Sequence, residues 1–478
     1  MLVGIDLGTS SVKAIALDTK GQMVAEASHP YPVHAPQPGW AESDPAHWWD
    51  AVAIAVRAVT HNFADSVQAI GLSGQMHGVV LTDASGNPLR PAILWADTRS
   101  SEVLHNYHAL TSELQQPLAN PIATGMAGCS LLWLRHDEPD VYRTARWALQ
   151  PKDWLRFQMT GAIATEPSDA SGTLLYDVIA DEWAWAVMEA LHLRSDWLPE
   201  VIPSRAIAGN LIPDAADHLG LPSDIPIIAG AADTAAAALG SGLLAPGVMQ
   251  LTVGSGAQLI TLQTQPQPDS HRRTHLFRSA LPNQWYALAA IQNAGLALEW
   301  VRQILGLSWA EVYDQAFAIS PGCEGLTFLP YLTGDRTPHL DPNARGAWIG
   351  LGLHHTRVHL MRAALEGVAF SIRQGLDVMP LHPSTIRLAG GGTVEPLWRQ
   401  LLADVLQTSL RPVDIPAASA LGAALLAGLG VGIYSSVDEL PAVCLPSTLI
   451  TPNSLDPHLD AAWKRYEALS TPPPYRRN

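Results

Sequence analysis

The sequence of 478 residues predicts an α/β protein built from two domains. A chain of this length exceeds what one compact hydrophobic core accommodates. Its hydrophobic content of 47% is typical of a globular protein that buries a large core. Strand and helix signals alternate up to about residue 240, and an opening hairpin pattern returns near residue 248. We therefore expect two diverged copies of one α/β unit, at residues 1–242 and 243–478.

The first unit opens with an apolar run, a polar turn and a second apolar run, LVGIDLGTSSVKAIALD, which predicts a β-hairpin. The segment SDPAHWWDAVAIAVRAVT predicts a helix, with Ser43 or Asp44 as its cap and Pro45 in its first turn. Residues 67–95 then predict a strand, a turn and a strand, with a further turn at residues 83–87 before another strand.

The second unit repeats the hairpin pattern in VMQLTVGSGAQLITL, residues 248–262. The segment TIRLAGGGTVEPLWRQLLADVL predicts a strand, a triple-glycine turn and a helix starting near Thr393. This helix places four apolar residues on one side: Leu397, Leu401, Leu402 and Val405. The tail from about Thr451 is rich in proline, and AAWKRYEAL predicts a docking helix before a frayed end.

Charge, cysteine content and hydropathy exclude several classes of protein. The net charge of −16 argues against nucleic-acid and anionic-membrane partners, which need a clustered positive surface. The three cysteines are few, odd in number and widely spaced, so we expect no disulfide framework and a reducing compartment. The start MLVGIDLG lacks the features of a signal peptide, and no apolar run resembles a membrane span. We expect a soluble, cytoplasmic protein.

Three glycine-rich turns offer closely spaced backbone N–H groups that suit phosphate oxygens. They are Gly8-Thr9-Ser10-Ser11, Gly254-Ser255-Gly256 and Gly390-Gly391-Gly392. The first adds hydroxyl donors and the nearby Lys13, and Asp6 precedes it at the end of the strand, where a carboxylate can hold Mg²⁺ directly or through water. Ordinary hairpin turns also favour glycine, serine and aspartate. The repetition of the pattern favours phosphate binding.

Other ligand-binding patterns are absent or weak. The P-loop pattern GxxxxGK[ST] does not occur. The glycines of GLGVG, residues 428–432, follow a helical stretch and predict a helix end. His355 and His359 are four residues apart, but no acidic ligand stands at the spacing of a zinc site, so we expect a helix N-terminus there.

Two further groups are candidates for substrate binding and catalysis. Gln75, Met76 and His77 lie in a predicted turn, and their two hydrogen-bonding side chains around an apolar one suit a polyol, although a structural histidine is the alternative. Asp233 is the only charged residue or histidine between Asp224 and Asp269. A lone buried carboxylate is costly unless something compensates it. Among small neighbours at a domain junction it is a candidate general base, and it could also cap the helix that follows.

Together and in this order, the motifs resemble those of the FGGY carbohydrate kinases. The matching segments run along nearly the whole chain: GIDLGTSSVKAIALD, DPAHWWDAV, GLSGQMHG, RPAILWADTRS, LQPKDWLRFQMTG, SDASGTLLYD, IIAGAADTAAAALGSG, TVGSGAQ, FLPYLTGDRTPHLDPNARGAWIGL, RAALEGVAF and LAGGGTVEPLWRQLLADVL. The resemblance implies two ribonuclease H-like domains of the actin/Hsp70/sugar-kinase type, an α/β ATPase fold, with ATP and sugar in the cleft between them.

The resemblance also implies roles for individual residues. Asp233 matches the general base, and Asp6 matches the residue tied to Mg²⁺ and the phosphates. The first two glycine turns, with Lys13 beside the first, match the phosphate loops, and the third turn matches the adenosine motif. Met76 and His77 match sugar contacts, and we add their neighbour Gln75 and the base's neighbour Thr234 as candidates.

The expected activity is an ATP- and Mg²⁺-dependent pentulose kinase that converts D-xylulose to D-xylulose 5-phosphate. Two departures weaken the inference to D-xylulose: Thr234 stands where the family commonly has Asn or Gln, and Ser130 where it commonly has Lys. A kinase of another ketose or polyol such as ribulose, and an ATPase switch of the same fold, are the alternatives. The sequence leaves the oligomeric state open, with a homodimer as one possibility.

Overall fold

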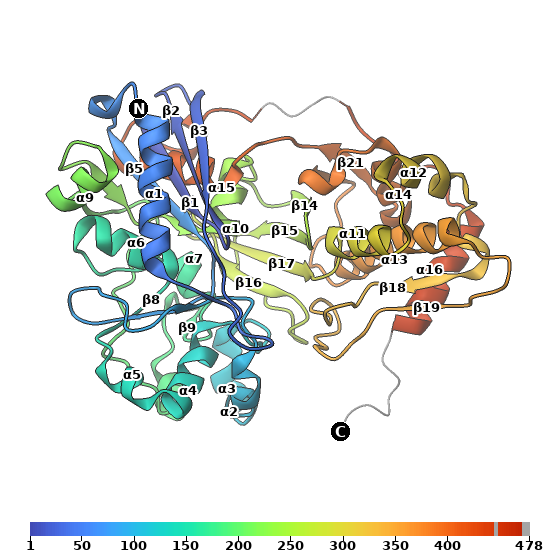
Figure 1. Cartoon of the computed structure of the whole chain (residues 1–478), viewed down its shortest axis with the longest axis horizontal. Helices are drawn as coiled ribbons and strands as arrows, with labels where there is room; N and C mark the ends of the chain where they lie inside the picture. Colours follow the sequence, from blue (N-terminus) through green and yellow to red (C-terminus); the bar gives the residue numbers. More distant parts are fainter. Residues whose placement is uncertain (444–447, 471–478) are drawn as a thin grey trace.

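The computed structural model describes residues 1–443 and 448–470, so the predicted frayed end lies outside the described residues. Two α/β domains lie side by side, and each is centred on its own mixed sheet (Figure 1). In the described part of the chain, no helix has the length and apolar character needed to cross a membrane.

The first sheet has the strand order β11-β12-β5-β1-β2-β3, with the short β13 beside β5. Its strands are β1 (Leu2–Leu7), β2 (Ser11–Leu17), β3 (Met23–Pro30), β5 (Ala69–Gly74), β11 (Ile207–Asn210), β12 (Pro226–Ile228) and β13 (Ala231–Ala232). Strand β1 pairs antiparallel with β2, and β2 with β3. Strands β1, β5 and β12 run parallel. The predicted opening hairpin is confirmed.

The second sheet repeats this arrangement with the order β16-β17-β15-β14-β20-β21. Its strands are β14 (Met249–Val253), β15 (Ala257–Gln263), β16 (His275–Arg278), β17 (Trp285–Ile291), β20 (Thr385–Ala389) and β21 (Ser409–Pro412). The antiparallel run β14-β15-β17 corresponds to β1-β2-β3, and the parallel run β14-β20-β21 corresponds to β1-β5-β12. The expected repeat of one unit is confirmed at the level of topology.

Helices and short ladders complete the two domains. The helices of the first half are α1 (Pro45–Thr60), α2 (Leu104–His108), α3 (Ser112–Gln115), α4 (Ala127–Asp137), α5 (Pro139–Thr144), α6 (Pro151–Thr160), α7 (Pro167–Ala170), α8 (Trp185–Ala190), α9 (Pro213–Leu219) and α10 (Asp233–Gly240). Those of the second half are α11 (Gly295–Ile304), α12 (Trp309–Gln315), α13 (Arg357–Asp377), α14 (Pro396–Leu406), α15 (Ala418–Gly430) and α16 (Pro457–Ser470). The two-stranded ladders use β4 (Glu42–Ser43), β6 (Val80–Thr82), β7 (Ala92–Ile93), β8 (Trp147–Leu149), β9 (Tyr176–Asp177), β10 (Glu182–Trp183), β18 (Thr327–Leu329) and β19 (Ala347–Ile349).

Local sequence signals set several helix ends as expected. Asp44, rather than Ser43, caps α1 by accepting a hydrogen bond from the Ala46 N–H at 2.9 Å. Helix α15 ends at Gly430, within the glycines predicted to mark a helix end. Helix α16 packs Trp463 and its apolar neighbours into the core of the second domain, as predicted for a docking helix.

The predicted start of α14 near Thr393 is wrong. The helix begins at Pro396 with Glu395 as its cap, and residues 391–393 form a separate short 3₁₀ turn. Proline lacks an N–H and suits the first turn of a helix, so the backbone before it is free to follow the glycines. Leu397 is 45% exposed in this first turn, and Trp398 is buried in the core instead.

Helix α15 joins the two halves of the chain. It belongs to the second half of the sequence, yet it packs on β1, β5 and α10 among the first-half strands (Figure 1). A Cβ atom at Gly4 or Gly71 would collide with backbone carbonyls of α15, so the close approach of helix and sheet requires glycine. The proposed boundary between residues 242 and 243 therefore separates the two halves of the sequence. Helix α15 crosses that division in space, because it comes from the second half and packs on the first sheet.

Candidate active site

Asp233 is the first residue of α10, at the carboxyl edge of the first sheet. The residue at the N-cap position is Ala232, so the alternative that Asp233 caps the helix is wrong. Its Oδ1 accepts hydrogen bonds from the N–H of Thr234 at 2.6 Å and from the Thr234 hydroxyl at 3.1 Å. Burial raises the pKa of Asp233 to about 6, and the Thr234 hydrogen bonds oppose this rise.

Asp6 lies near the end of β1, two strands away from Asp233. Strand β5 lies between them, because it pairs with β1 through Ser73 opposite Asp6 and with β13 just before Asp233. The Ser73 hydroxyl donates to Asp6 Oδ1 at 3.1 Å. Burial, followed by the charge of Asp233, raises the pKa of Asp6 to about 7, while Ser73 and Lys13 act in the opposite direction. The parallel strands thus bring two carboxylates into electrostatic contact at one edge of the sheet.

The first glycine turn connects β1 and β2 beside Asp6. The Gly8 N–H donates to the Ser11 carbonyl at 3.0 Å. Thr9 Oγ1 accepts a hydrogen bond from the Trp95 indole at 2.9 Å, and Ser10 is exposed. The tip of this turn is therefore exposed at Ser10, while hydrogen bonds to Gly8 and Thr9 fix the rest of the turn.

Lys13 does not point into the first turn. It lies on β2, and its ammonium pairs with Glu26 on β3 at 2.9 Å. Both side chains are about one-third exposed, at 36% and 35%. The charge of Lys13 lowers the pKa of Asp6, and it is the weakest of the four contributions to that pKa.

The second glycine turn is held against the start of α11. The carbonyls of Gly254 and Ser255 accept hydrogen bonds from the N–H groups of Gly295 at 3.0 Å and Leu296 at 2.9 Å. A Cβ atom on Gly256 would approach the carbonyl oxygen of Ile291 to 2.7 Å, which requires glycine at that position. Gly254 and Ser255 are exposed.

The third glycine turn lies beside the second, because β14 and β20 are parallel neighbours. Gly390 has φ +98°, and a Cβ there would collide with the carbonyl oxygen of Val253 at the end of β14. A Cβ on Gly391 would meet nothing within 4 Å, and one on Gly392 would lie 3.0 Å from the same Val253 oxygen. The sequence therefore brings the second and third turns together and leaves Gly391 facing open space.

Gln75, Met76 and His77 follow β5, between the two domains. Gln75 is buried, and its Nε2 donates to the Gly8 carbonyl at 3.1 Å, so it supports the first glycine turn. The sulfur of Met76 accepts a long hydrogen bond from the Tyr286 hydroxyl of the second domain at 3.7 Å. His77, with φ +73°, contacts the ring of Phe277 at a centroid distance of 5.8 Å. These residues lie where the second domain meets the first.

The protonation of His77 follows from its partner. Its Nδ1 lies 2.7 Å from the Gly172 carbonyl, which only accepts hydrogen bonds, so Nδ1 carries the proton. Burial lowers the pKa of His77 to about 4, which keeps the ring neutral at physiological pH. Its Nε2 is therefore a hydrogen-bond acceptor.

The structure also brings to the site a residue that the sequence did not single out. Arg336, in the loop after β18, lies with its guanidinium 5.4 Å from the Trp95 ring, and its charge acts on His77. Burial alone lowers its pKa, with no carboxylate contributing. A single arginine within FLPYLTGDRTPH is the signal that could have pointed to it.

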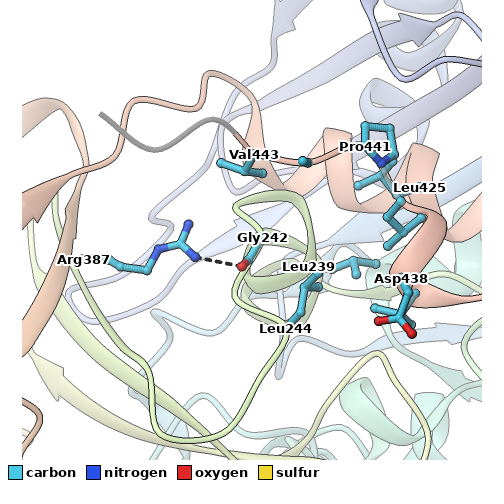
Figure 2. A pocket seen from close by; sticks show the side chains of 11 residues that line it. Leu239, Gly242, Leu244, Arg387, Leu425, Asp438, Pro441 and Val443 are labelled. Atoms are coloured by element: carbon cyan, nitrogen blue, oxygen red, sulfur yellow. Dashed lines mark hydrogen bonds between the residues drawn. The ribbon is translucent and has the colours of Figure 1, made fainter. Parts of the chain in front are cut away.

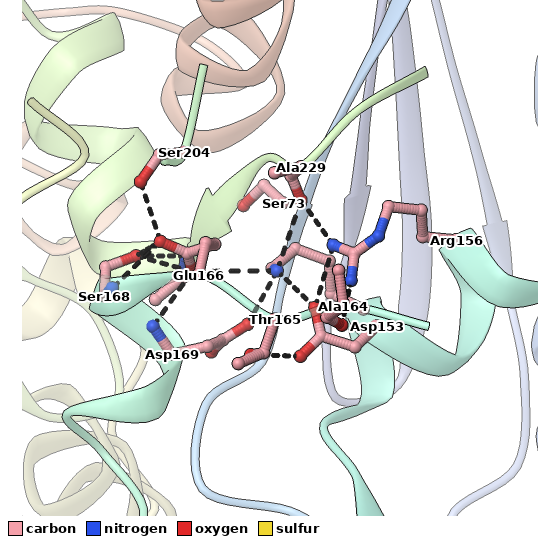
Figure 3. A network of polar contacts seen from close by, with 12 residues as sticks. Ser73, Asp153, Arg156, Ala164, Thr165, Glu166, Ser168, Asp169, Ser204 and Ala229 are labelled. Carbon is pink, nitrogen blue, oxygen red and sulfur yellow. Dashed lines mark hydrogen bonds and ion pairs between the residues drawn. The ribbon is translucent and has the colours of Figure 1, made fainter. Parts of the chain in front are cut away.

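A second group missed by the sequence is a buried polar cluster behind Asp233, formed by Lys152, Asp153, Arg156, Glu166 and Asp169 (Figure 3). All five side chains have 0% exposure. The segments LQPKDWLRFQMTG and TEPSDASG carry these charges among apolar and small residues, which is the signal in the sequence. We call this group the Lys152 cluster.

A cavity of about 290 Å³ lies at the opposite end of α10 from Asp233 (Figure 2). It is lined by Leu239, Gly242, Leu244, Arg387, Leu425, Val437, Asp438, Leu440, Pro441, Ala442 and Val443. The buried guanidinium of Arg387 donates to the Gly242 carbonyl at 2.8 Å and also to that of Ser241. Arg387, a cation from β20, thus binds the carbonyls after α10, where the helix dipole favours positive charge.

The histidines before α13 do not support a metal site. Ligand atoms of Glu324, His354 and His355 lie within 4.8 Å of one another. However, His355 Nδ1 accepts a hydrogen bond from the Gly352 N–H at 2.8 Å, so Nε2 carries the proton of the neutral ring and has no lone pair for a metal. His359 forms part of the capping box of α13, which confirms the predicted helix N-terminus.

Residues 1–240 match the N-terminal domain of the FGGY family of carbohydrate kinases, and residues 249–431 match the C-terminal domain of the same family. The chain belongs to this family. The resemblance found in the sequence is confirmed, and with it the two-domain α/β sugar-kinase fold related to actin and Hsp70. The protein is a carbohydrate kinase, an enzyme that uses ATP and a sugar as substrates.

Curated relatives and solved structures match almost the full chain. The xylulose kinase of Escherichia coli (strain K12) is 36% identical, over 92% of this chain and 92% of that protein. The xylulose kinase of Bacillus subtilis (strain 168) is 32% identical, over 92% and 90%. The crystal structure of a xyloylose kinase from Brucella ovis superposes with a TM-score of 0.90 at 32% identity, covering 98% of both chains. A gluconate kinase from Lactobacillus acidophilus superposes with a TM-score of 0.91 at 25% identity, covering 98% and 96%.

Proposed function

We propose that this FGGY kinase transfers the γ-phosphate of ATP to D-xylulose and forms D-xylulose 5-phosphate, with Asp233 as the general base. The observation that carries the proposal is the carboxylate of Asp233, which is half-buried beside Asp6 and has a pKa raised to about 6. A general base works best when its pKa lies near the operating pH. The similarity to xylulose kinases over 92% of the chain supports the choice of sugar.

The two oxygens of Asp233 have different tasks in this proposal. Thr234 binds Oδ1 twice, and no described residue donates a hydrogen bond to Oδ2. Oδ2 is then the atom that takes the proton from the 5-hydroxyl of the sugar, while that oxygen bonds to the γ-phosphorus and the bond from phosphorus to ADP breaks. A base of this kind contributes about 10²- to 10⁴-fold in rate, and alignment of the reactants supplies much of the rest.

The sugar is held by residues at the end of β5. His77 Nε2 accepts a hydrogen bond from a sugar hydroxyl, and Met76 contacts the carbon skeleton. Gln75 and Thr234, which the sequence suggested as sugar contacts, instead support the first glycine turn and the base, respectively. In this proposal they act on the substrate through those groups.

The glycine turns hold the nucleotide. The backbone N–H groups of residues 9–10 in the first turn and of residues 255–256 in the second bind the phosphates, and residues 390–392 contact adenosine. Gly8 and Gly254 close these two turns, because their N–H groups donate to the carbonyls of Ser11 at 3.0 Å and Gly256 at 2.8 Å. Lys13 adds positive charge near the first turn, although its ammonium is paired with Glu26. Backbone amides suit this task because they place donors at phosphate oxygens without side-chain obstruction.

Asp6 fits a magnesium site. Mg²⁺ prefers hard oxygen ligands and usually combines one or two carboxylates with phosphates and water. Asp6 is partly exposed, accepts one hydrogen bond from Ser73 and lies beside Asp233, so its carboxylate would hold Mg²⁺ directly or through water. When bound, the ion neutralises phosphate charge. A metal ligand must be ionised, and a pKa of about 7 in Asp6 makes Mg²⁺ binding stronger above neutral pH.

A kinase of another sugar is the second candidate function. Thr234 replaces the Asn or Gln common in the family, and the gluconate kinase structure shows that this fold accommodates a different sugar. A coupled assay of ADP release with D-xylulose, D-ribulose, L-ribulose, gluconate and glycerol separates the two. D-xylulose should give the highest kcat/KM. Strong turnover of another sugar together with weak turnover of D-xylulose would identify that other sugar as the substrate.

Three further features stay predictions of the sequence. They are the division into domains at residues 1–242 and 243–478, a cytoplasmic location and assembly as a homodimer. Light scattering coupled to size-exclusion chromatography tests the last of these directly.

A further inference from the structure

The Lys152 cluster contacts the segment that leads into Asp233, and Figure 3 shows it beside Ala229 of that segment. Lys152 Nζ lies 2.7 Å from Asp153 Oδ1, 3.1 Å from Asp169 Oδ2 and 3.6 Å from Glu166 Oε1. Arg156 joins the cluster through Asp153 at 3.0 Å. Two cations and three carboxyl groups therefore share one fully buried space.

The cluster is expensive to bury. Burial raises the pKa of Asp169 well above its usual range. Taking even balanced charges out of water costs several kcal/mol per ion, and apolar residues of the same size are often as stable. A buried network of this kind is better explained by the geometry it imposes than by stability.

The cluster contacts the backbone of residues 229–232 at both ends. At one end, Arg156 donates to the Ala229 carbonyl at 2.7 Å, and Lys152 donates to the same oxygen at 3.4 Å. At the other end, the Ser168 hydroxyl donates to the Glu166 carboxylate at 2.8 Å and accepts a hydrogen bond from the Ala232 N–H at 2.9 Å. Ala232 directly precedes the residue assigned as the base.

We propose that Ser168, backed by Glu166 and Lys152, is a positioning residue that fixes the Ala232 amide and thereby aims the Asp233 carboxylate. The proposal rests on the assignment of Asp233 as the general base. Because the single hydroxyl proton of Ser168 is donated to Glu166, its lone pairs are turned to Ala232. A displacement of about 1 Å in a reacting group can cost about 100-fold in rate, so a backbone anchor one residue away controls catalysis without touching the substrate.

The chain offers a matched control in Ser204. Its hydroxyl donates to the same carboxylate, Glu166 Oε2, at the same distance of 2.8 Å. This is the one hydrogen bond of that hydroxyl within residues 1–443 and 448–470, and it does not involve Ala232. Ser204→Ala therefore removes an equivalent hydrogen bond from the cluster and leaves the anchor of Asp233 in place.

The test compares Ser168→Ala and Ser204→Ala in the full-length enzyme. Turnover of D-xylulose is divided by the number of ATP-binding sites counted by calorimetric titration, so that loss of folded protein does not count as loss of catalysis. Amide hydrogen exchange of the segment around Ala232 is measured by mass spectrometry. We expect kcat per site to fall about 10- to 100-fold in Ser168→Ala and to stay within about threefold in Ser204→Ala.

Two other readouts accompany the rate. Exchange around Ala232 should accelerate in Ser168→Ala alone. The acidic limb of kcat/KM should also move to lower pH in that variant, because a loosened segment admits water to Asp233 and relieves the burial that raises its pKa. A change in stability alone would not move this limb.

The proposal would be overturned if both variants lost kcat per site equally and showed equal amide exchange around Ala232. The cluster would then contribute stability alone. Wild-type turnover per site in Ser168→Ala would also overturn it. If the wild-type enzyme does not phosphorylate D-xylulose, the proposed substrate fails, and the exchange comparison still decides the anchoring role of Ser168.

Discussion

The two sheets share one topology but differ in the residues at the carboxyl ends of their strands. In the first sheet, β1 ends in Asp6 and Leu7 before the glycine turn, and Asp233 lies two strands away. At the equivalent place in the second sheet, β14 ends in Thr252 and Val253 before its turn. The duplicated unit thus supplies two glycine turns, and the first copy adds Asp6 and Asp233, two carboxylates with raised pKa values, at its strand ends. The two sheets have the same topology, so the residues at their strand ends make the difference. These residues give the first domain the proposed catalytic carboxylates and leave the second domain with proposed nucleotide binding.

The largest expected difference between the two copies is at the paired positions Asp6 and Thr252. Asp6→Asn should lower kcat about 10- to 100-fold, because it weakens the proposed magnesium site. Thr252→Ala should change kcat less than about threefold, since surface or half-buried substitutions without a special role have small effects. Initial rates over a range of Mg²⁺ concentrations check both variants. A comparable fall in kcat in both variants would show that the ends of β1 and β14 do not differ in their role in catalysis.

The second difference concerns the glycine turns of the second domain. Gly390→Ala forces a side chain against the Val253 carbonyl at a φ of +98° and should raise KM for ATP about tenfold, from strain of about 1–3 kcal/mol. In Gly391→Ala the added Cβ meets no protein atom within 4 Å, so a rise in KM for ATP in that variant would come from contact with adenosine rather than from strain. Titration of each variant with ATP measures the effect. A larger rise in KM for ATP in Gly391→Ala than in Gly390→Ala would mean that the nucleotide itself fills the space at Gly391.

A smaller effect is expected at Thr234, which tunes the base in the first domain. Its hydroxyl stabilises the charged form of Asp233 and so lowers the pKa of that carboxyl group against the effect of burial. Thr234→Ala should raise this pKa above about 6 and move the acidic limb of kcat/KM to higher pH, so that activity at pH 6 falls about two- to threefold more than at pH 8.

Thr234→Ser keeps the hydroxyl and is the control, for which the limb should stay in place. A shift of equal size in both variants would assign the effect to lost packing. A shift toward lower pH in Thr234→Ala would contradict the direction worked out from the hydrogen bonds.

The hairpins, the cap of α1 and the repeat of one unit were predictable because each depends on a local pattern of apolar residues, glycine and capping residues. Asp233 stood out for the same reason, as a lone charge in an apolar stretch. The partners of Lys13 and Gln75 were not predictable, because they depend on the register of β2 with β3 and on how the first turn folds back over β5.

The Lys152 cluster and Arg336 were missed for a related reason. Their charges lie in helices and loops far from Asp233 in sequence. Only tertiary packing shows that the cluster is buried and that the half-buried Arg336 lies beside the site. The start of α14 was placed wrongly because a proline and a triple glycine both signal a helix boundary, and the sequence alone does not say which one the backbone uses.

The measurement that tests the central claim most directly is ³¹P NMR of mixtures of ATP, Mg²⁺ and D-xylulose with wild-type enzyme and with Asp233→Asn. The substitution keeps the size of the side chain and removes its ability to accept a proton. The wild-type enzyme should convert the γ-phosphate signal to a phosphomonoester. Asp233→Asn should form it at least about 100-fold more slowly while calorimetry shows unchanged ATP binding. Phosphomonoester formation by Asp233→Asn at the wild-type rate would contradict the assignment of Asp233 as the base.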